Sequence, residues 1–275
     1  MSPVAIISST VGWIYVLLWS ISFYPQVLTN LNRKSSSGLS IDFTLLNALG
    51  LTAYTVFNAV LLYSPVVRAQ YASRLPGSPT PPVQFNDLVY AAHGAGICLV
   101  IFSQTQWPQM WGFRGSKAAL SLGAIGVFWA CIGIIFAGVG SVLVGLSERW
   151  EWLDVVYTIG NIKLFLTVMK YTPQVFHNYR RQSTEGFSIY AILFDFTGGL
   201  LSVLQLLLDI SEQGSWSQMS TGKGAKFALG NVTMVFDITF MVQHYILYRH
   251  RSKGKARRDE RAPSEDDPLL EHREV

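Results

Sequence analysis

Seven long apolar runs constrain this chain more than any other feature of its sequence. Each run is about 20 residues long, the length that a helix needs to cross the hydrocarbon core of a bilayer. A soluble α/β enzyme would instead show short strands that alternate with amphipathic helices. We therefore predict an all-α membrane protein whose spans cover residues 9–31, 39–62, 86–106, 118–143, 153–179, 187–209 and 227–248.

The composition also favours a lipid-facing surface. Half of the 275 residues are hydrophobic and only 14% are charged, whereas an ordinary soluble domain carries about 25% charged residues. The net charge of +4 does not predict a nucleic-acid partner, because the basic residues lie in short loops and in one tail. Phosphate-binding loops and the usual hydrolase motifs are absent from the sequence, so we expect neither an enzyme nor an ATP-driven pump, and no bound cofactor.

The segments between the runs differ in composition from the runs. The connection from Tyr63 to Gln84 contains five prolines, which is typical of a loop rather than a helix. Residues 249–275 are polar and charged, and we predict a disordered tail there.

The positive-inside rule gives the predicted spans an orientation. Seven spans place the two termini on opposite sides, and the side of the C-terminal tail carries more lysine and arginine. The C-terminus is therefore expected in the cytosol and the N-terminus in a lumen. The basic residues on the tail side are Arg33, Lys34, Arg114, Lys117, Arg180, Arg181 and those of residues 249–261, against Arg68, Arg74, Arg149, Lys223 and Lys226 on the other side.

An internal duplication organises the chain. When Pro25 is aligned with Pro173, at an offset of 148 residues, eleven of the 26 positions from 25 to 50 are identical. The predicted domains are a three-helix bundle over residues 9–106, a linker helix over 118–143 and a second bundle over 153–248. A weaker match, Asp87 with Asp237, suggests that the third span of each half also corresponds. Transporters built from repeated halves bind their substrate near the middle of the membrane, between the halves.

Each half carries a Pro-Gln pair inside a predicted span. A proline inside a helix removes one backbone donor and bends the helix, so Pro25 and Pro173 predict two matching kinks. A structural kink alone is the simpler interpretation, but its repetition favours a moving hinge. Gln26 and Gln174 lie beside these kinks and can either satisfy freed backbone groups or bind the substrate.

Ionisable residues inside the predicted spans are candidates for function, because each costs about 2.5–3.5 kcal/mol or more to insert. Lys163 and Lys170 are seven residues apart on one helix face, about 10 Å along the axis, and could each hold one carboxylate of a long substrate. Asp195 corresponds in the repeat to Asn47, so one half has an ionisable group where the other has an amide. This asymmetry is typical of a single proton-binding site. Neutralisation of Asp195 by a lysine remains the alternative.

Two further aspartates are candidates for proton coupling. Asp237 lies within the last predicted span, and Asp87 lies at the start of the third.

The C-terminal tail predicts two kinds of partner. Its basic segment, residues 249–261, suits anionic membrane lipids. Glu265 precedes Leu269 and Leu270 in a pattern similar to the dileucine sorting signals that clathrin adaptors bind.

These motifs resemble a known family. The strings Phe23-Tyr24-Pro25-Gln26 and Lys170-Tyr171-Thr172-Pro173-Gln174, with Asp195-Phe196-Thr197-Gly198-Gly199, resemble the PQ-loop family and, within it, the lysosomal cystine–proton symporters. The resemblance covers residues 10 to 250 and lacks the family's long N-terminal lumenal region, as expected of a short, fungal-type member.

The resemblance implies export of L-cystine from an acidic lysosomal or vacuolar lumen to the cytosol by alternating access, driven by protons. It further implies that Asn47, Lys163, Lys170 and Asp195 line the substrate site, and that Asp87, Asp195 and Asp237 take part in proton coupling. Two alternatives remain open: an exporter of basic amino acids, and a receptor or trafficking protein that transports nothing.

Overall fold

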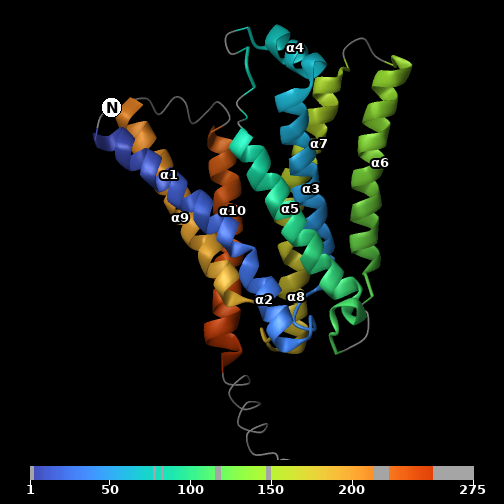
Figure 1. The fold of residues 1–275 in the computed structure, drawn as a ribbon, viewed down its shortest axis with the longest axis vertical. Helices are drawn as coiled ribbons and strands as arrows, with labels where there is room; N and C mark the ends of the chain where they lie inside the picture. Colours follow the sequence, from blue (N-terminus) through green and yellow to red (C-terminus); the bar gives the residue numbers. More distant parts are fainter. Residues whose placement is uncertain are drawn as a thin grey trace, which may run out of the picture.

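The fold is built from helices (Figure 1). The computed structural model describes residues 3–76, 79–81, 83, 85–114, 119–146, 150–213 and 223–249. No strand occurs among these residues. The all-α prediction is therefore confirmed for the described part of the chain.

Long helices occupy each of the predicted ranges, with somewhat shifted ends. They are α1 (Pro3–Ser22) with α2 (Tyr24–Arg33), α3 (Ile41–Tyr63), α5 (Phe85–Gln106), α6 (Leu122–Val144), α7 (Trp152–Met169) with α8 (Tyr171–Arg181), α9 (Ile189–Gln213) and α10 (Lys223–Val242), which continues into a π-helical turn, η3 (Gln243–Leu247).

In the part of the chain that the structure describes, five helical segments are long and apolar enough to cross a membrane. They are Ile6–Arg33, Ile41–Tyr63, Asp87–Gln106, Leu122–Val144 and Trp152–Arg181. The apolar part of α9 is shorter, Ile189–Gln205. The topology of seven spans therefore stays a prediction, although helices are present in all seven ranges.

The prediction of a loop between Tyr63 and Gln84 was wrong in part, because a helix, α4 (Pro65–Arg74), begins directly after α3. Pro65 lies in its first turn, where a missing N–H costs nothing, and the Ser64 side chain caps the helix. At its far end, Arg74 donates hydrogen bonds to both oxygens of Asp154, 2.6 and 2.7 Å away. These bonds raise the pKa of Arg74 and hold α4 against the start of α7.

Both Pro-Gln segments interrupt their helices at matching places. The first break lies between α1 and α2 at Phe23, and the second lies between α7 and α8 at Lys170. Each proline lacks the N–H that would bond four residues back, so the preceding turn loses one hydrogen bond. The two short helices α2 and α8 also end alike, because Lys34 and Gln182 both adopt a left-handed conformation.

The helices of the two halves are intertwined. The most extensive contacts join α1 to α9, and α3 to both α5 and α7 (Figure 1). The first helix of each half thus packs along the second helix of the opposite half. The predicted division into two separate three-helix bundles is not confirmed by this arrangement.

The connections after α2 and α8 touch each other through their backbones. Gly38 and Gly186 occupy equivalent positions of the repeat. A Cβ atom added to Gly38 would lie 2.3 Å from the carbonyl carbon of Gly186, and Gly186 itself has a positive φ of 84°. Only glycine permits this approach, which brings the two halves together at the end where the termini of α2 and α8 lie.

Two buried glutamines cross between the halves at this contact. Gln26 accepts a hydrogen bond from the Ser188 backbone N–H (2.7 Å) and donates one to the Gly186 carbonyl (3.0 Å). Gln174 repeats both bonds in the opposite direction, with the Ser40 N–H (2.8 Å) and the Gly38 carbonyl (3.1 Å). Each glutamine therefore satisfies the loop backbone of the other half.

Each glutamine starts a relay of amides that reaches the third helix of its own half. Gln26 donates to Asn30 (2.9 Å), which donates to Gln104 of α5 (2.8 Å). In the second half the equivalent series is Gln174, Asn178 and Gln243, with two bonds of 2.9 Å. We call these six residues the glutamine clasp; they are between 0% and 5% exposed.

The clasp corrects the repeat alignment of the third helices. Gln104 and Gln243 are equivalent, which makes the offset 139 residues rather than 150. Asp237 therefore corresponds to Cys98, and the predicted match of Asp87 with Asp237 was wrong. The error arose because the connection before the third helix has a different length in each half.

Replacing a clasp glutamine should destabilise the fold. Gln174→Leu keeps a similar size but leaves the Ser40 N–H, the Gly38 carbonyl and Asn178 without their partner. Each buried group left unpaired costs about 1–3 kcal/mol. We expect the thermal unfolding midpoint of the purified protein to fall by several degrees.

The exposed Gln109→Leu serves as the matched control, at the same end of the molecule. An unfolding midpoint for Gln174→Leu equal to that of this control would contradict a stabilising role for the clasp.

Candidate functional site

The predicted Asn47 and Asp195 occupy the same place in the two halves, six residues into α3 and six residues into α9. Both helices begin directly after the serines that the clasp binds, so the two side chains lie about 9 Å further along. Lys170 lies at the break between α7 and α8. The structure thus brings these three predicted residues to one region, next to the clasp.

Lys170 and Asn47 are in direct contact. The ammonium group of Lys170 donates a hydrogen bond to Asn47 Oδ1, 2.9 Å away. The amide nitrogen of Asn47 donates in turn to the thiol of Cys98 on α5, 3.0 Å away. This contact joins the second half, through Lys170, to the second and third helices of the first half.

Tyr171 links Lys170 to Asp195. Its hydroxyl donates a hydrogen bond to Asp195 Oδ2 at 3.1 Å, and the ammonium of Lys170 lies 4.6 Å from the centre of its ring. The ring also stacks on Phe236 of α10, with 5.1 Å between centroids, and is 3% exposed. One buried tyrosine therefore contacts a positive group over its ring and a carboxyl group at its hydroxyl.

Asp237 of α10 lies near Asp195 and Lys170. It is 1% exposed, and its Oδ1 atom has no hydrogen-bond partner among the described residues. Asp195 and Lys170 both act on it electrostatically. A buried polar atom without a partner is uncommon in folded proteins and indicates strain or function.

Lys163 and Asp87 lie further from the clasp. Lys163 is seven residues before Lys170, about 10 Å along α7, and its ammonium lies 4.7 Å from the ring centre of Tyr54. Asp87, at the start of α5, acts electrostatically on the same tyrosine. The structure therefore places these two predicted residues at a second polar position rather than beside Asp195.

Exposure differs between the site and the clasp. Asn47, Lys163, Lys170 and Asp195 are all partly exposed, although they lie on helices that suit a membrane interior. The clasp beside them is buried. The four candidate side chains are thus more accessible than the clasp that lies next to them.

The predicted substrate contacts of Gln26 and Gln174 stay a prediction, and in this conformation both side chains bind the protein instead. Both N–H groups of each amide are already used, for a loop carbonyl and for an asparagine. Substrate contact through either amide would therefore require the clasp to open. Pro25 and Pro173 lie beside the helix breaks, and their role as hinges stays a prediction.

Sequence reasoning missed Tyr171 and Cys98 as parts of the site. Tyr171 follows Lys170 in the repeated string, and its counterpart Phe23 lacks the hydroxyl that reaches Asp195. That difference was visible in the alignment. Cys98 could be found only once Gln104 and Gln243 fixed the equivalence of the third helices.

Among the described residues, no group of three or more histidines, cysteines or acidic side chains could hold a metal ion.

Comparison with known proteins identifies the family. The PQ-loop repeat matches residues 7–67 and 155–214, and each match contains one copy of the duplicated Pro-Gln segment. A cystinosin homolog of Dictyostelium discoideum is 38% identical over 255 residues, which cover 92% of this chain and 86% of that protein. The chain belongs to the cystinosin group of PQ-loop proteins.

Other members of the cystinosin group match over most of this chain. Bovine cystinosin is 38% identical over 90% of the chain, although the match spans 65% of the bovine protein. A protein of Saccharomyces cerevisiae named cystine transporter is 29% identical, over 88% of this chain and 94% of that protein. The family resemblance seen in the motifs is thereby confirmed.

The predicted sorting residues Glu265, Leu269 and Leu270 lie outside the described residues.

The hydroxyl of Tyr171 should contribute to stability through Asp195. Tyr171→Phe keeps the ring between Lys170 and Phe236 but removes the hydrogen bond to the carboxyl group. A hydrogen bond to a charged group contributes about 1.5–3 kcal/mol, so the thermal unfolding midpoint should fall by a few degrees.

Tyr190→Phe is the control, because that tyrosine is 67% exposed on the neighbouring helix α9. Equal midpoints for the two variants would show that the Tyr171–Asp195 bond adds nothing to the fold.

Proposed function

We propose that this protein exports cystine from an acidic lysosomal or vacuolar lumen to the cytosol together with protons. One observation carries the proposal: in a member of the cystinosin group, Tyr171 contacts both Lys170 and Asp195 at the helix break of the second half, and Lys170 binds Asn47 of the first half. Repeat-built transporters bind their substrates in such places, where interrupted helices meet near the middle of the membrane.

The opposite charges of Lys170 and Asp195 suit a substrate that is a double zwitterion. Cystine has a carboxylate and an ammonium group at each end, joined through a disulfide. Lys170 can bind a carboxylate and Asp195 an ammonium group, while Asn47 offers both a donor and an acceptor. Lys163 lies about 10 Å from Lys170 along α7, and Asp87 acts on the same Tyr54 that Lys163 contacts. These two residues repeat the two signs of charge where the second end of a long solute would lie.

Three aspartates are the proposed proton carriers. Asp195 accepts a hydrogen bond from the Tyr171 hydroxyl and acts electrostatically on Asp237, so a proton on either carboxyl group would change the charge next to the substrate. The unpartnered Oδ1 atom of Asp237 supports its inclusion. Asp87, near the predicted lumenal end, would exchange protons with the lumen. Protons taken up there would be released when the site opens to the cytosol.

Alternating access would depend on the clasp and on the helix breaks. The described conformation is closed where the glutamine clasp joins the halves. Opening that end requires the four hydrogen bonds between glutamines and loops to break together, with bending at the segments of Pro25 and Pro173. The closed clasp supports a conformation that is shut at the predicted cytosolic end.

A solute screen in proteoliposomes tests the proposal. An acidic interior should drive efflux of labelled cystine faster than equal pH on both sides. Arginine and lysine should neither be transported nor compete. Transport of arginine or lysine instead of cystine would indicate a basic amino-acid exporter. Absence of flux for every solute would favour a receptor or trafficking protein.

Variants of Asp195 and Asp237 should distinguish proton coupling from cystine transport itself. In Asp195→Asn and Asp237→Asn the pH gradient should no longer stimulate cystine efflux, while exchange of cystine at equal pH, which needs no net proton movement, should continue in at least one of them. Asp42→Asn is the control, since its side chain would keep the acceptor for the Ser121 N–H. Full stimulation in both variants would contradict the assigned proton sites.

A further inference from the structure

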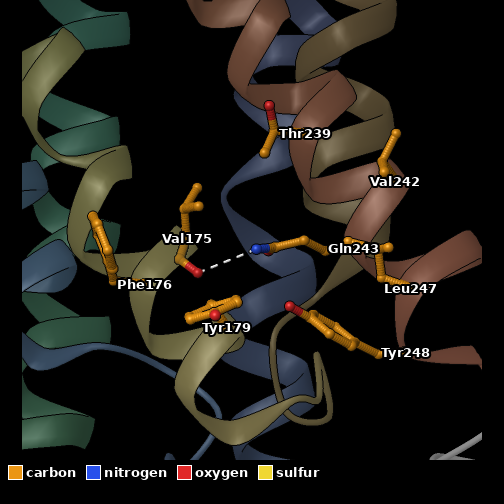
Figure 2. A pocket seen from close by; sticks show the side chains of 8 residues that line it. All are labelled: Val175, Phe176, Tyr179, Thr239, Val242, Gln243, Leu247 and Tyr248. Carbon is orange, nitrogen blue, oxygen red and sulfur yellow. Dashed lines mark hydrogen bonds between the residues drawn. The ribbon is translucent and has the colours of Figure 1, made fainter.

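A groove lies between α8 and the end of α10, beside the clasp (Figure 2). It has a volume of about 330 Å³. Figure 2 shows its walls, with one side from α8 and the other from α10 and its π-helical turn. The lining residues are Val175, Phe176, Tyr179, Thr239, Val242, Gln243, Leu247 and Tyr248. We call this feature the α8/α10 groove.

The walls of the groove suit a hydrocarbon chain. Phe176 and Leu247 are 57% and 60% exposed, so apolar surface faces outward along its length. Two tyrosines, Tyr179 and Tyr248, lie at the end where both helices stop, as tyrosines do where a membrane meets water. The groove therefore runs from an apolar section to an interfacial end.

That interfacial end is positively charged. Arg180 lies one turn beyond Phe176 on the same face of α8, and Arg249 directly follows Tyr248; both side chains are exposed. The nearby Glu185 is bonded to Arg33 at 2.9 Å. Five more lysines and arginines follow between residues 250 and 258 of the sequence. A ligand with an apolar chain and an anionic head group matches both parts of the groove.

The repeat offers an internal comparison. The counterpart of Arg180 in the first half is Asn32. There the chain after α5 turns back towards the end of α2, where the Arg114 N–H bonds the Lys34 carbonyl (2.8 Å) and Phe113 is 6% exposed. The open groove and its arginines thus belong to the second half and are no consequence of the shared scaffold.

The groove and the clasp share a residue. Gln243 lines the groove and donates a hydrogen bond to the Val175 carbonyl at 3.1 Å, drawn as a dashed line in Figure 2. The side-chain amide oxygen of Gln243 accepts a hydrogen bond from Asn178, the middle residue of the clasp relay. Gln243 also begins the π-helical turn, a type of distortion frequent at functional sites. An occupant of the groove would pack directly against the clasp.

We propose that an anionic phospholipid binds in the α8/α10 groove, with an acyl chain along Phe176 and Leu247 and its head group at Arg180 and Arg249. The bound lipid stabilises the closed clasp through Gln243. This site is additional to the proposed transport activity, and its binding test does not depend on that activity.

Thermal unfolding of the purified full chain in detergent tests this site. Dioleoyl phosphatidylserine should raise the unfolding midpoint by on the order of 3 °C more than dioleoyl phosphatidylcholine, since a ligand that binds only the folded state stabilises it. The double variant Arg180→Gln/Arg249→Gln should lose this difference. Its midpoint in phosphatidylcholine shows whether it is folded.

Two controls identify the source of the effect. Lys34→Asn/Arg114→Gln removes two charges at the same end but outside the groove, and should keep the full difference. Glycerophosphoserine, the head group without acyl chains, should produce no rise. The proposal is overturned by equal midpoints in the two lipids for the unmodified chain, by an equal loss in the control variant, or by a full rise with glycerophosphoserine.

Discussion

The crossed hydrogen bonds of Gln26 and Gln174 are the interaction on which this structure depends. Two loops that touch through glycines bury backbone groups, and each buried group needs a partner. Each glutamine supplies an acceptor and a donor to the loop of the opposite half. Because neither half can complete these bonds alone, the clasp forms only when both halves are in place.

The clasp also determines where the ionic groups lie. Tyr171 is three residues before Gln174 and Lys170 is at the helix break, so fixing the glutamine positions both. On this symmetric scaffold the chemistry is unequal. Asn47 and Cys98 occupy in the first half the places that Asp195 and Asp237 occupy in the second. The duplicated backbone therefore carries carboxyl groups in the second half where the first half has an amide and a thiol.

The sequence was sufficient where local rules decide the outcome. Apolar runs predicted the helices, and the repeat paired Asn47 with Asp195. The family resemblance placed Asn47, Lys163, Lys170 and Asp195 at one site, and the structure brings three of these four together. The sequence failed where long-range contacts decide. The helix α4 was missed because prolines were interpreted as breakers although Pro65 starts a helix. The role of the glutamines depends on loops of the opposite half, which no local pattern shows.

The central claim is that a cystine molecule binds at Lys170 and Asp195 beside the closed clasp. A structure determined with cystine at acidic pH tests it most directly. The account predicts one carboxylate of cystine at the Lys170 ammonium, an ammonium group at Asp195 and the second end near Lys163. Cystine bound elsewhere, with the Lys170–Asn47 contact unchanged, would contradict the account.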